Sequence, residues 1–292
     1  MSRADLPRSV RRTYSHAFYL PAGILFAVLF IAPTILAFYF SLTRWTLFDA
    51  EFIGLDNFSQ FLREPALTNG MRNTLIYAVV TSGLKVIIGL LLAVLLTSSI
   101  RFRTLLRSII FFPVLVSTVA VGITFAVLMH PSKGLINRAL ELIGIDGPSW
   151  LTDPGIALLS VAFVDVWKGV GIAMVIFIAG ILSIPEEYVD AVRLEGGFWA
   201  KLRHVIVPLS RNATFTVILL SFIGGLRTFD LIWTMTRGGP GFTTDVIAST
   251  IYKQYQAGFY GLATAGNVLV FIVVIIIVYP MMRFFSRREI EL

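Results

Sequence analysis

Four ionisable residues stand inside stretches of sequence that are otherwise apolar. Asp165 and Lys168 are three residues apart, and so are Arg227 and Asp230. Residues at this spacing share one face of a helix, so each pair can neutralise itself. Because a charge inside a membrane is costly, such residues either hold helices together or line a polar route for a solute. Spacing alone leaves both interpretations open.

Under the second interpretation, the nearby aromatic residues Trp167, Phe229 and Trp233 would offer flat faces to sugar rings. Lys85 stands alone in its apolar stretch, where packing or snorkelling is favoured over contact with a solute. The residues that we assign to a polar substrate pathway are Asp165, Trp167, Lys168, Arg227, Phe229, Asp230, Trp233 and Asn267.

Motifs of other chemistries are missing from the sequence. It contains no GxxxxGK[ST] phosphate-binding loop, no GxSxG nucleophile turn and no HExxH metal motif. The three histidines, His16, His130 and His204, are far apart, and the absence of cysteine excludes thiolate ligands and disulfides. We therefore predict no catalytic residue, no metal and no cofactor in this chain.

Composition indicates the elements that must position these residues. Of the 292 residues, 57% are hydrophobic and only 14% are charged, and the mean hydropathy is +0.83. Such values predict an all-α, polytopic membrane protein with about six transmembrane helices. A single transmembrane domain, residues 18–285, would lie between a basic N-terminus, 1–17, and a tail, 286–292. The expected spans are residues 18–40, 73–97, 108–129, 155–182, 213–235 and 262–285.

Lysine and arginine set the expected orientation. They gather before the first span, after the second, between the fourth and fifth, and after the sixth. The positive-inside rule then puts both termini in the cytoplasm. The net charge of +7 is thus a sign of topology, and nucleic-acid binding is not predicted, because no basic patch is interleaved with aromatic residues.

Residues 183–209 form the longest charged, amphipathic segment and predict two short helices around a Gly196-Gly197 turn. Ser183 and Glu186 have the spacing of a capping box, and Pro208 separates the unit from the next span. A charged helix–glycine–helix unit is suited to docking a soluble partner. An amphipathic loop lying on the membrane surface is the alternative, and spacing does not decide between them.

The same segment resembles the EAA motif of the permease subunits of binding-protein-dependent ABC importers. The motif is matched by Asp190-Ala191-Val192, by Glu195-Gly196-Gly197 and by Val205-Ile206-Val207-Pro208. It departs from the family pattern with Asp for Glu, Val for Ala, Glu for Asp and Gly for Ala. The residues to which the resemblance assigns coupling to an ATPase are Asp190, Ala191, Glu195, Gly196, Gly197, Phe198, Leu202 and Pro208.

Other segments are similar to the carbohydrate branch of that family, which includes maltose and glycerol-3-phosphate importers. The resemblance runs over residues 18–285, with Arg237 departing from the small residue that the family usually has there. The segments that carry it are 41–45 (SLTRW), 52–61 (FIGLDNFSQF), 131–136 (PSKGLI), 165–168 (DVWK) and 229–240 (FDLIWTMTRGGP).

The resemblance implies a pore-forming subunit, not itself an enzyme, in a bacterial or archaeal inner membrane. Its partners would be a second, homologous permease, two subunits that bind ATP and magnesium, and an extracytoplasmic binding protein that delivers a sugar. The alternative is a secondary transporter or channel that acts alone and uses Asp165, Lys168, Arg227 and Asp230 with an ion gradient. A membrane scaffold or a membrane enzyme is less favoured still.

Overall fold

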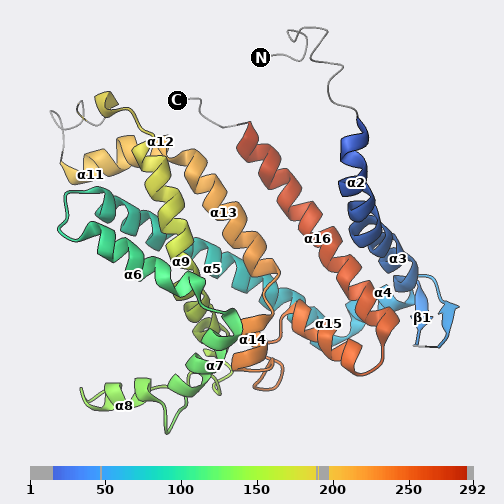
Figure 1. Ribbon diagram of the computed structural model, residues 1–292. Coiled ribbons are helices and arrows are strands. Elements are labelled where there is room, and N and C mark those ends of the chain that lie inside the picture. The colour runs from blue at the N-terminus through green and yellow to red at the C-terminus, as the bar shows by residue number, and fades with distance from the viewer. Residues whose placement is uncertain (1–15, 47, 189, 191–196, 288–292) are drawn as a thin grey trace, which may run out of the picture.

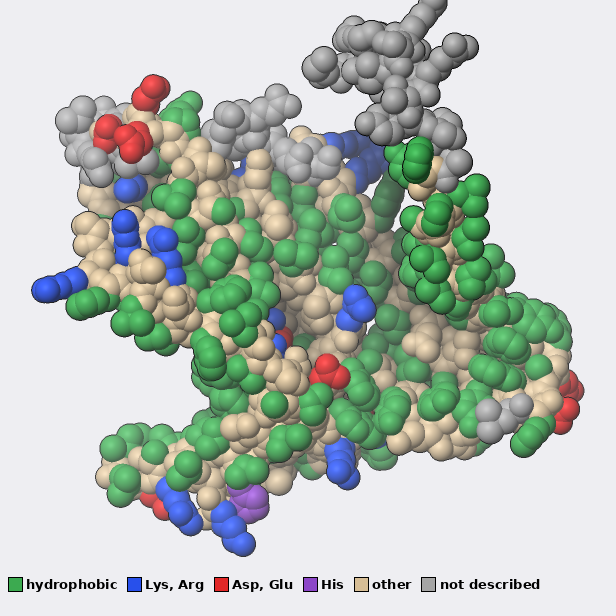
Figure 2. All heavy atoms as spheres, in the orientation of Figure 1, with side chains coloured by type: hydrophobic (Ala, Val, Ile, Leu, Met, Phe, Trp, Pro, Cys, Tyr) green, Lys and Arg blue, Asp and Glu red, His purple; other side chains and the backbone are tan. Residues whose placement is uncertain are grey.

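The computed structural model describes residues 16–46, 48–188, 190 and 197–287 of the chain. Within them, four helices are long and apolar enough to cross a membrane, and two bent pairs of helices bring the total to six if each pair counts as one span. This confirms the predicted all-α, polytopic fold with about six spans. Figure 2 shows hydrophobic side chains over most of the middle of the molecule and most charged side chains toward its two ends.

The first span is one continuous helical rod from Leu20 to Ser41. Pro21 and Pro33 lie at the starts of α2 and α3, where the type of helix changes within the rod. A π-helical turn precedes Pro33, and such a turn is one way in which a helix accommodates local irregularity. The parts of the rod are η1 (His16–Tyr19), α2 (Leu20–Phe26), η2 (Ala27–Ile31) and α3 (Ala32–Ser41).

A small β-hairpin follows the first span and is the exception to an all-helical fold. Strands β1 (Thr43–Trp45) and β2 (Ala50–Phe52) pair antiparallel, with Thr43 opposite Phe52. The next helix, α4 (Asp56–Arg63), is tied back to this exit by Asn57, whose side-chain amide donates to the carbonyls of Ser41 at 2.9 Å and Thr43 at 2.8 Å. Strands of three residues are too short to leave a pattern in the sequence.

Two long helices, α5 (Pro65–Thr97) and α9 (Ala157–Leu182), form the centre of the fold. Helix α5 begins at Pro65, ahead of the expected residue 73, because proline is tolerated in a first turn. The two helices share buried clusters along their length, with Tyr77 packed near Val161 in one and Ala93 near Phe177 in another.

The third span is sharply bent. Helix α6 (Arg103–Leu115) and helix α7 (Thr118–Leu128) meet at 97°, just after Pro113. Val116 between them has an extended backbone, so the helix is interrupted and not merely curved. A short helix, α8 (Leu135–Glu141), lies in the loop that follows.

The fifth span is broken at both ends. The segment Phe198–Leu209 meets the next helix at a bend of 68°, and the helix expected to reach residue 235 stops at Leu226. A separate short helix follows it. The elements are α11 (Phe198–Lys201), η3 (Leu202–Ile206), α12 (Val207–Leu209), α13 (Arg211–Leu226) and α14 (Asp230–Met235).

The last two helices are α15 (Ile247–Gln256) and α16 (Tyr260–Ser286). Figure 1 shows α11, α12 and the end of α16 at one end of the bundle, and β1, α8 and α15 at the other. We call these the α11 end and the α15 end. The two candidate regions of the sequence, the charged loop and the intramembrane charges, therefore lie at different depths of the same bundle.

Candidate functional site

An ion pair joins the two central helices. The Lys85 ammonium on α5 lies 2.8 Å from the Asp165 carboxylate on α9, and these side chains are only 10% and 22% exposed. The interpretation of Lys85 as a lone residue is therefore wrong, and so is the pairing of Asp165 with Lys168. Gly169, one turn after Asp165, makes the room, because a Cβ atom there would lie 2.7 Å from the Lys85 side chain.

Tyr77 extends this polar centre and was missed by sequence reasoning. It lies two turns before Lys85 on α5 and is only 1% exposed. Its hydroxyl is buried without a hydrogen-bond partner in the described part of the chain, which is costly for a polar group. A tyrosine eight residues before an intramembrane lysine was the one available signal, since both then face the same side of a helix.

The second predicted pair does not share a helix. Arg227 is the residue at which α13 ends, and Asp230 opens α14 after an irregular link. Both side chains are exposed, and within the described residues they form no ion pair with each other. Lys168 is half-buried and, in the same part of the chain, also lacks an ion-pair partner. Within the described residues, these three charges are thus not neutralised by an ion pair.

Three aromatic rings from two helices form a cluster beside these charges. Phe229 and Trp233 stack with ring centroids 5.6 Å apart, and Tyr252 on α15 meets them edge-on at 5.3 Å and 4.9 Å. We call Phe229, Trp233 and Tyr252 the aromatic triad. Tyr252 was not among the predicted residues, because nothing in the sequence links it to α14.

The other predicted pathway residues lie apart from the triad. Trp167 packs against Phe125 of α7 with centroids 5.1 Å apart and is 40% exposed. Asn267 on α16 lines a groove of about 380 Å³ together with Phe30 and Thr34 of the first span. None of the remaining predicted residues lines that groove.

At the α11 end, a short helix presents aromatic side chains outward. Phe198 and Trp199 of α11 are 58% and 76% exposed and contact each other edge-on at 5.5 Å. The segment is anchored by Val205 and Ile206, which are only 4% and 3% exposed. Phe198 also lines the cavity described next.

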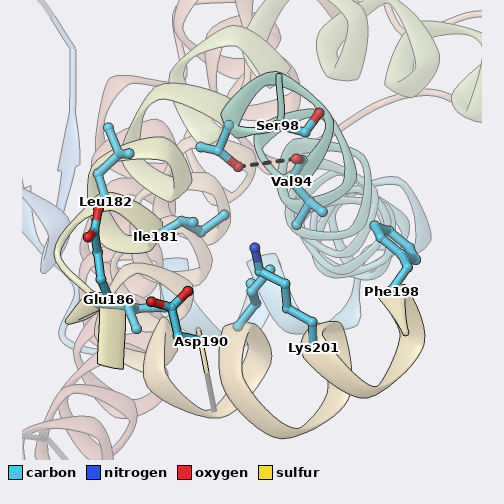
Figure 3. A pocket seen from close by; sticks show the side chains of 11 residues that line it. Val94, Ser98, Ile181, Leu182, Glu186, Asp190, Phe198 and Lys201 are labelled. Carbon is cyan, nitrogen blue, oxygen red and sulfur yellow. Dashed lines mark hydrogen bonds between the residues drawn. The ribbon is translucent and has the colours of Figure 1, made fainter. Parts of the chain in front are cut away.

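A cavity of about 340 Å³ lies beneath this segment, between the ends of α5 and α9 and the start of α11. Figure 3 shows the side chains of Glu186, Asp190 and Lys201 at this cavity, which Ser98 of the α5 end also lines. Charged groups of both signs therefore line it, under an exposed apolar helix.

Of the predicted coupling residues, Asp190 and Phe198 line this cavity. Gly197 has an extended backbone and precedes α11, Leu202 is half-buried, and Pro208 is exposed. The Ser183 hydroxyl donates to the carbonyl of Gly180 at 2.9 Å and so satisfies the end of α9. The residues of this set that lie outside the described ranges are Ala191, Glu195 and Gly196.

The arrangement of His, Asp and Glu side chains also bears on metal binding. Among the residues that the structure describes, no group of three or more His, Asp or Glu side chains is placed to hold a metal ion.

Comparisons with known proteins identify a family and relatives of this chain. Residues 85–291 match the family described as binding-protein-dependent transport system inner membrane components. A probable ABC transporter permease protein, YurN of Bacillus subtilis (strain 168), is 30% identical over 94% of this chain and 97% of its own length. The trehalose/maltose transport system permease protein MalF of Thermococcus litoralis is 30% identical, covering 88% of each chain.

A solved structure has the same fold. It is that of a bacterial ABC transporter involved in the import of the acidic polysaccharide alginate, with a TM-score of 0.81 and 23% sequence identity. The match covers 93% of this chain and 94% of that one, so the fold is shared over nearly the whole length.

Proposed function

This chain belongs to the family of binding-protein-dependent transport system inner membrane components, and we propose that it is a permease subunit of an ATP-driven sugar importer. The observation that carries the proposal is the match of nearly the whole chain to permease proteins of such systems. The relatives are named for the transport of trehalose and maltose, of arabinooligosaccharides and of sn-glycerol-3-phosphate. Two of these three names are sugars, which favours a carbohydrate substrate.

The segment from Glu186 to Leu209 docks the ATPase. Phe198 and Trp199 are its exposed anchors, since large aromatic side chains contribute most to contact energy in protein interfaces. The charged cavity beneath them receives polar side chains of the partner. The buried Val205 and Ile206 pass the movement of the docked helix to the bundle. Asp190, Ala191, Glu195, Gly196 and Gly197 complete the motif by resemblance.

The sugar crosses the membrane beside the aromatic triad. Phe229 and Trp233 are stacked, and stacked rings give a flat surface for the C–H face of a sugar ring. Lys168, Arg227 and Asp230, which form no ion pair within the described residues, supply hydrogen bonds to hydroxyl groups. The Lys85–Asp165 pair and Trp167 contribute to the walls of this route. Asn267 reaches the route only where the first span and α16 separate.

The working assembly contains more chains than this one. A second, homologous permease completes the pore as a heterodimer, and two separate subunits bind ATP and magnesium and hydrolyse the nucleotide. An extracytoplasmic binding protein delivers the sugar. This chain itself holds no cofactor and is not an enzyme.

The protein resides in the inner membrane of a bacterium or archaeon, with both termini and the α11 end in the cytoplasm. Two observations support this orientation. Lysine and arginine are concentrated in the segments at that end, and α11, α12 and the end of α16 lie together there.

A secondary transporter acting alone is not favoured. Of the four charges that it would use, Asp165 is held by Lys85 at 2.8 Å and is not free to bind and release an ion. The family match points the same way, because its members are components of binding-protein-dependent systems.

Reconstitution tests the proposal. The chain is combined in proteoliposomes with a partner permease, an ATPase and a binding protein, and ATP hydrolysis is measured with a panel of neutral sugars and polyol phosphates. We expect hydrolysis to rise only with a binding protein loaded with one neutral sugar. Solute movement by this chain alone, abolished by an ionophore and independent of ATP, would overturn it.

A further inference from the structure

We propose that a cavity at the α15 end is a subsite for one ring of a neutral carbohydrate, outside the aromatic triad. The cavity measures about 470 Å³, within the range of pockets that hold small molecules. It lies between α4, the start of α5 and α15, at the end of the bundle opposite α11 (Figure 1). The side chains used in the argument are Gln60, Glu64, Phe242, Lys253, Gln254 and Phe259. The assignment rests on the proposed function.

A strained residue stands in the cavity wall. Phe242 has a φ of 69°, in the left-handed region that bulky residues rarely adopt, and its side chain is 55% exposed. Such strain costs roughly 1–3 kcal/mol and persists only where the surroundings enforce it, which is commonly at functional sites. The strained backbone therefore makes the Phe242 ring a candidate for ligand contact.

The surroundings enforce it through a network of hydrogen bonds within the loop 236–246. Thr244 donates to the carbonyl of Gly239 at 2.7 Å, and Thr243 donates to that of Pro240 at 2.7 Å. Asn73 of α5 then holds the loop from outside, donating at 2.9 Å to the carbonyls of both Thr243 and Asp245. A loop bonded in this way presents the Phe242 ring at a fixed place and is ready to bind without rearrangement.

An ion pair between Lys253, whose side chain is 31% exposed, and Asp245 belongs to the cavity lining. Asp245 is fully buried, and its carboxylate lies 2.7 Å from the Lys253 ammonium, which is also 5.0 Å from the centre of the Phe242 ring. Gly238 must be glycine, because a Cβ atom would collide with the Asp245 carboxylate and lie 2.7 Å from the ammonium. Lys253 is thus committed to Asp245 and does not leave a free positive charge in the cavity.

The balance of charge selects a class of ligand. With Lys253 neutralised by Asp245, the remaining charged group of the lining is the Glu64 carboxylate. A carboxylate repels phosphates and sugar acids but accepts hydrogen bonds from hydroxyl groups. The lining therefore favours a neutral sugar over an anionic one.

The polar groups suit hydroxyl-rich ligands. Gln60 and Gln254 each offer an amide that both donates and accepts, and in the described part of the chain neither side chain is already hydrogen-bonded. Phe242 and Phe259 are 55% and 57% exposed and supply flat apolar faces. Flat rings together with unpaired amides are what a pyranose, with its C–H face and hydroxyl rim, requires.

The absence of cysteine allows a direct test. Ala257 lines the cavity, and Ala50 lies exposed on β2 at the same end of the bundle. Single variants Ala257→Cys and Ala50→Cys are made in the full chain, isolated in nanodiscs with the subunits that co-purify. The rate of maleimide labelling is measured with maltose, with glucose 6-phosphate, and with a sugar-free binding protein.

We expect maltose to protect Ala257→Cys and not Ala50→Cys. At a concentration about four times the dissociation constant, labelling should slow roughly fivefold, because only the free fraction reacts. Adding Phe242→Gly, which removes the ring and suits the left-handed backbone, should abolish the protection, whereas adding Trp233→Ala in the triad should leave it. Glucose 6-phosphate should protect much less.

Several results would overturn the subsite. These are equal protection by glucose 6-phosphate, protection that survives Phe242→Gly, or protection by the sugar-free binding protein in place of maltose, which would make the cavity a protein contact. A failure of the proposed function looks different, because the wild-type assembly would then show no ATP-driven uptake. Uptake without any protection at Ala257→Cys would leave the importer standing and remove only the subsite.

Discussion

The Lys85 ammonium and the Asp165 carboxylate meet at 2.8 Å across the contact between α5 and α9, in the middle of the apolar bundle. Neither residue finds its partner on its own helix. The pair therefore fixes the relative position of two helices that also share the buried clusters around Tyr77 and Ala93. Both charges depend on this one contact, which makes it a sensitive place to perturb.

Lys85→Met should destabilise the protein because it leaves Asp165 without its partner. Removing one member of a buried pair costs about 3 kcal/mol, whereas replacing both members often restores stability. We expect a lower unfolding temperature in nanodiscs for Lys85→Met and recovery in the double variant Lys85→Met/Asp165→Leu. The matched control is Arg44→Met, since the Arg44–Glu51 pair is 69% exposed on both sides and should contribute less than about 1 kcal/mol. Equal losses in the two single variants would contradict a structural role for the central pair.

Gly171→Ala should separate α9 from α6. A Cβ atom at Gly171 would lie 2.8 Å from the carbonyl oxygen of Ile110 and 2.9 Å from the Cα of Phe111, and neither backbone atom can turn aside. Overpacking of this kind costs about 1–3 kcal/mol. Gly83→Ala is the control, because nothing lies within 4 Å of its Cβ position and alanine favours the helix. A thermal unfolding midpoint for Gly171→Ala at or above that of Gly83→Ala would refute the packing argument.

Trp199→Ala should uncouple the transporter without unfolding it. The side chain is 76% exposed, so its loss costs little stability, yet an aromatic anchor contributes about 2 kcal/mol to an interface. We expect binding of the ATPase to weaken more than about tenfold, measured by co-purification and by ligand-stimulated ATP hydrolysis. Phe48→Ala, which removes a 93% exposed ring at the opposite end, should leave both readings unchanged. Normal ATP hydrolysis by Trp199→Ala at normal expression would remove α11 as the docking element.

Trp233→Ala should lower the rate of sugar uptake because it removes one of the two stacked rings of the aromatic triad. Tyr252→Phe keeps the edge-on contacts at 5.3 Å and 4.9 Å and should transport nearly as the wild type. Aromatic contacts of this kind contribute about 1 kcal/mol each, so we expect the rate of sugar uptake by Trp233→Ala to fall roughly fivefold to tenfold. The measurement is uptake of labelled sugar at equal assembly. Wild-type uptake by Trp233→Ala would place the sugar route elsewhere.

Asn73→Ala should loosen the loop 236–246 and leave the bundle intact. The Asn73 amide makes both hydrogen bonds that hold the loop to α5, and each lost bond costs about 1 kcal/mol. Hydrogen exchange at the amides of residues 243–246 should speed up about tenfold or more. Asn69→Ala on the same helix is the control, as its side chain is exposed. Unchanged exchange in Asn73→Ala would show that the loop is held by its own hydrogen bonds alone.

Hydropathy predicted the long helices well because an apolar run of such length has few structural solutions. Helices α9 and α16 begin and end within a few residues of the expected spans 155–182 and 262–285. The breaks within the third and fifth spans were harder to predict from hydropathy. Pro113 marked the site of the bend in the third span, but a proline signal does not give its angle of 97°.

Side-chain partners were the part that the sequence could not supply. The pairing of Asp165 with Lys168 followed from spacing, whereas the structure pairs Asp165 with a residue 80 positions earlier. Arg227 and Asp230 were expected on one helix, yet α13 stops at Leu226, where Gly225 is pressed against α5. Contacts between distant segments depend on how helices pack, and a single sequence contains no direct record of that.

The bond between Asn73 and the loop has a consequence for recombining such proteins. Although 170 residues separate Asn73 from Thr243, the third turn of α5 and the loop 236–246 form one unit. They are joined again where the Ile247 amide donates to Thr74 at 2.8 Å. In a chimera that exchanges only the loop between two permeases, the Asn73 amide and the carbonyls of Thr243 and Asp245 would lose their hydrogen-bond partners. The smallest portable segment is therefore discontinuous, and loop grafts should carry the residues at positions 73 and 74 with them.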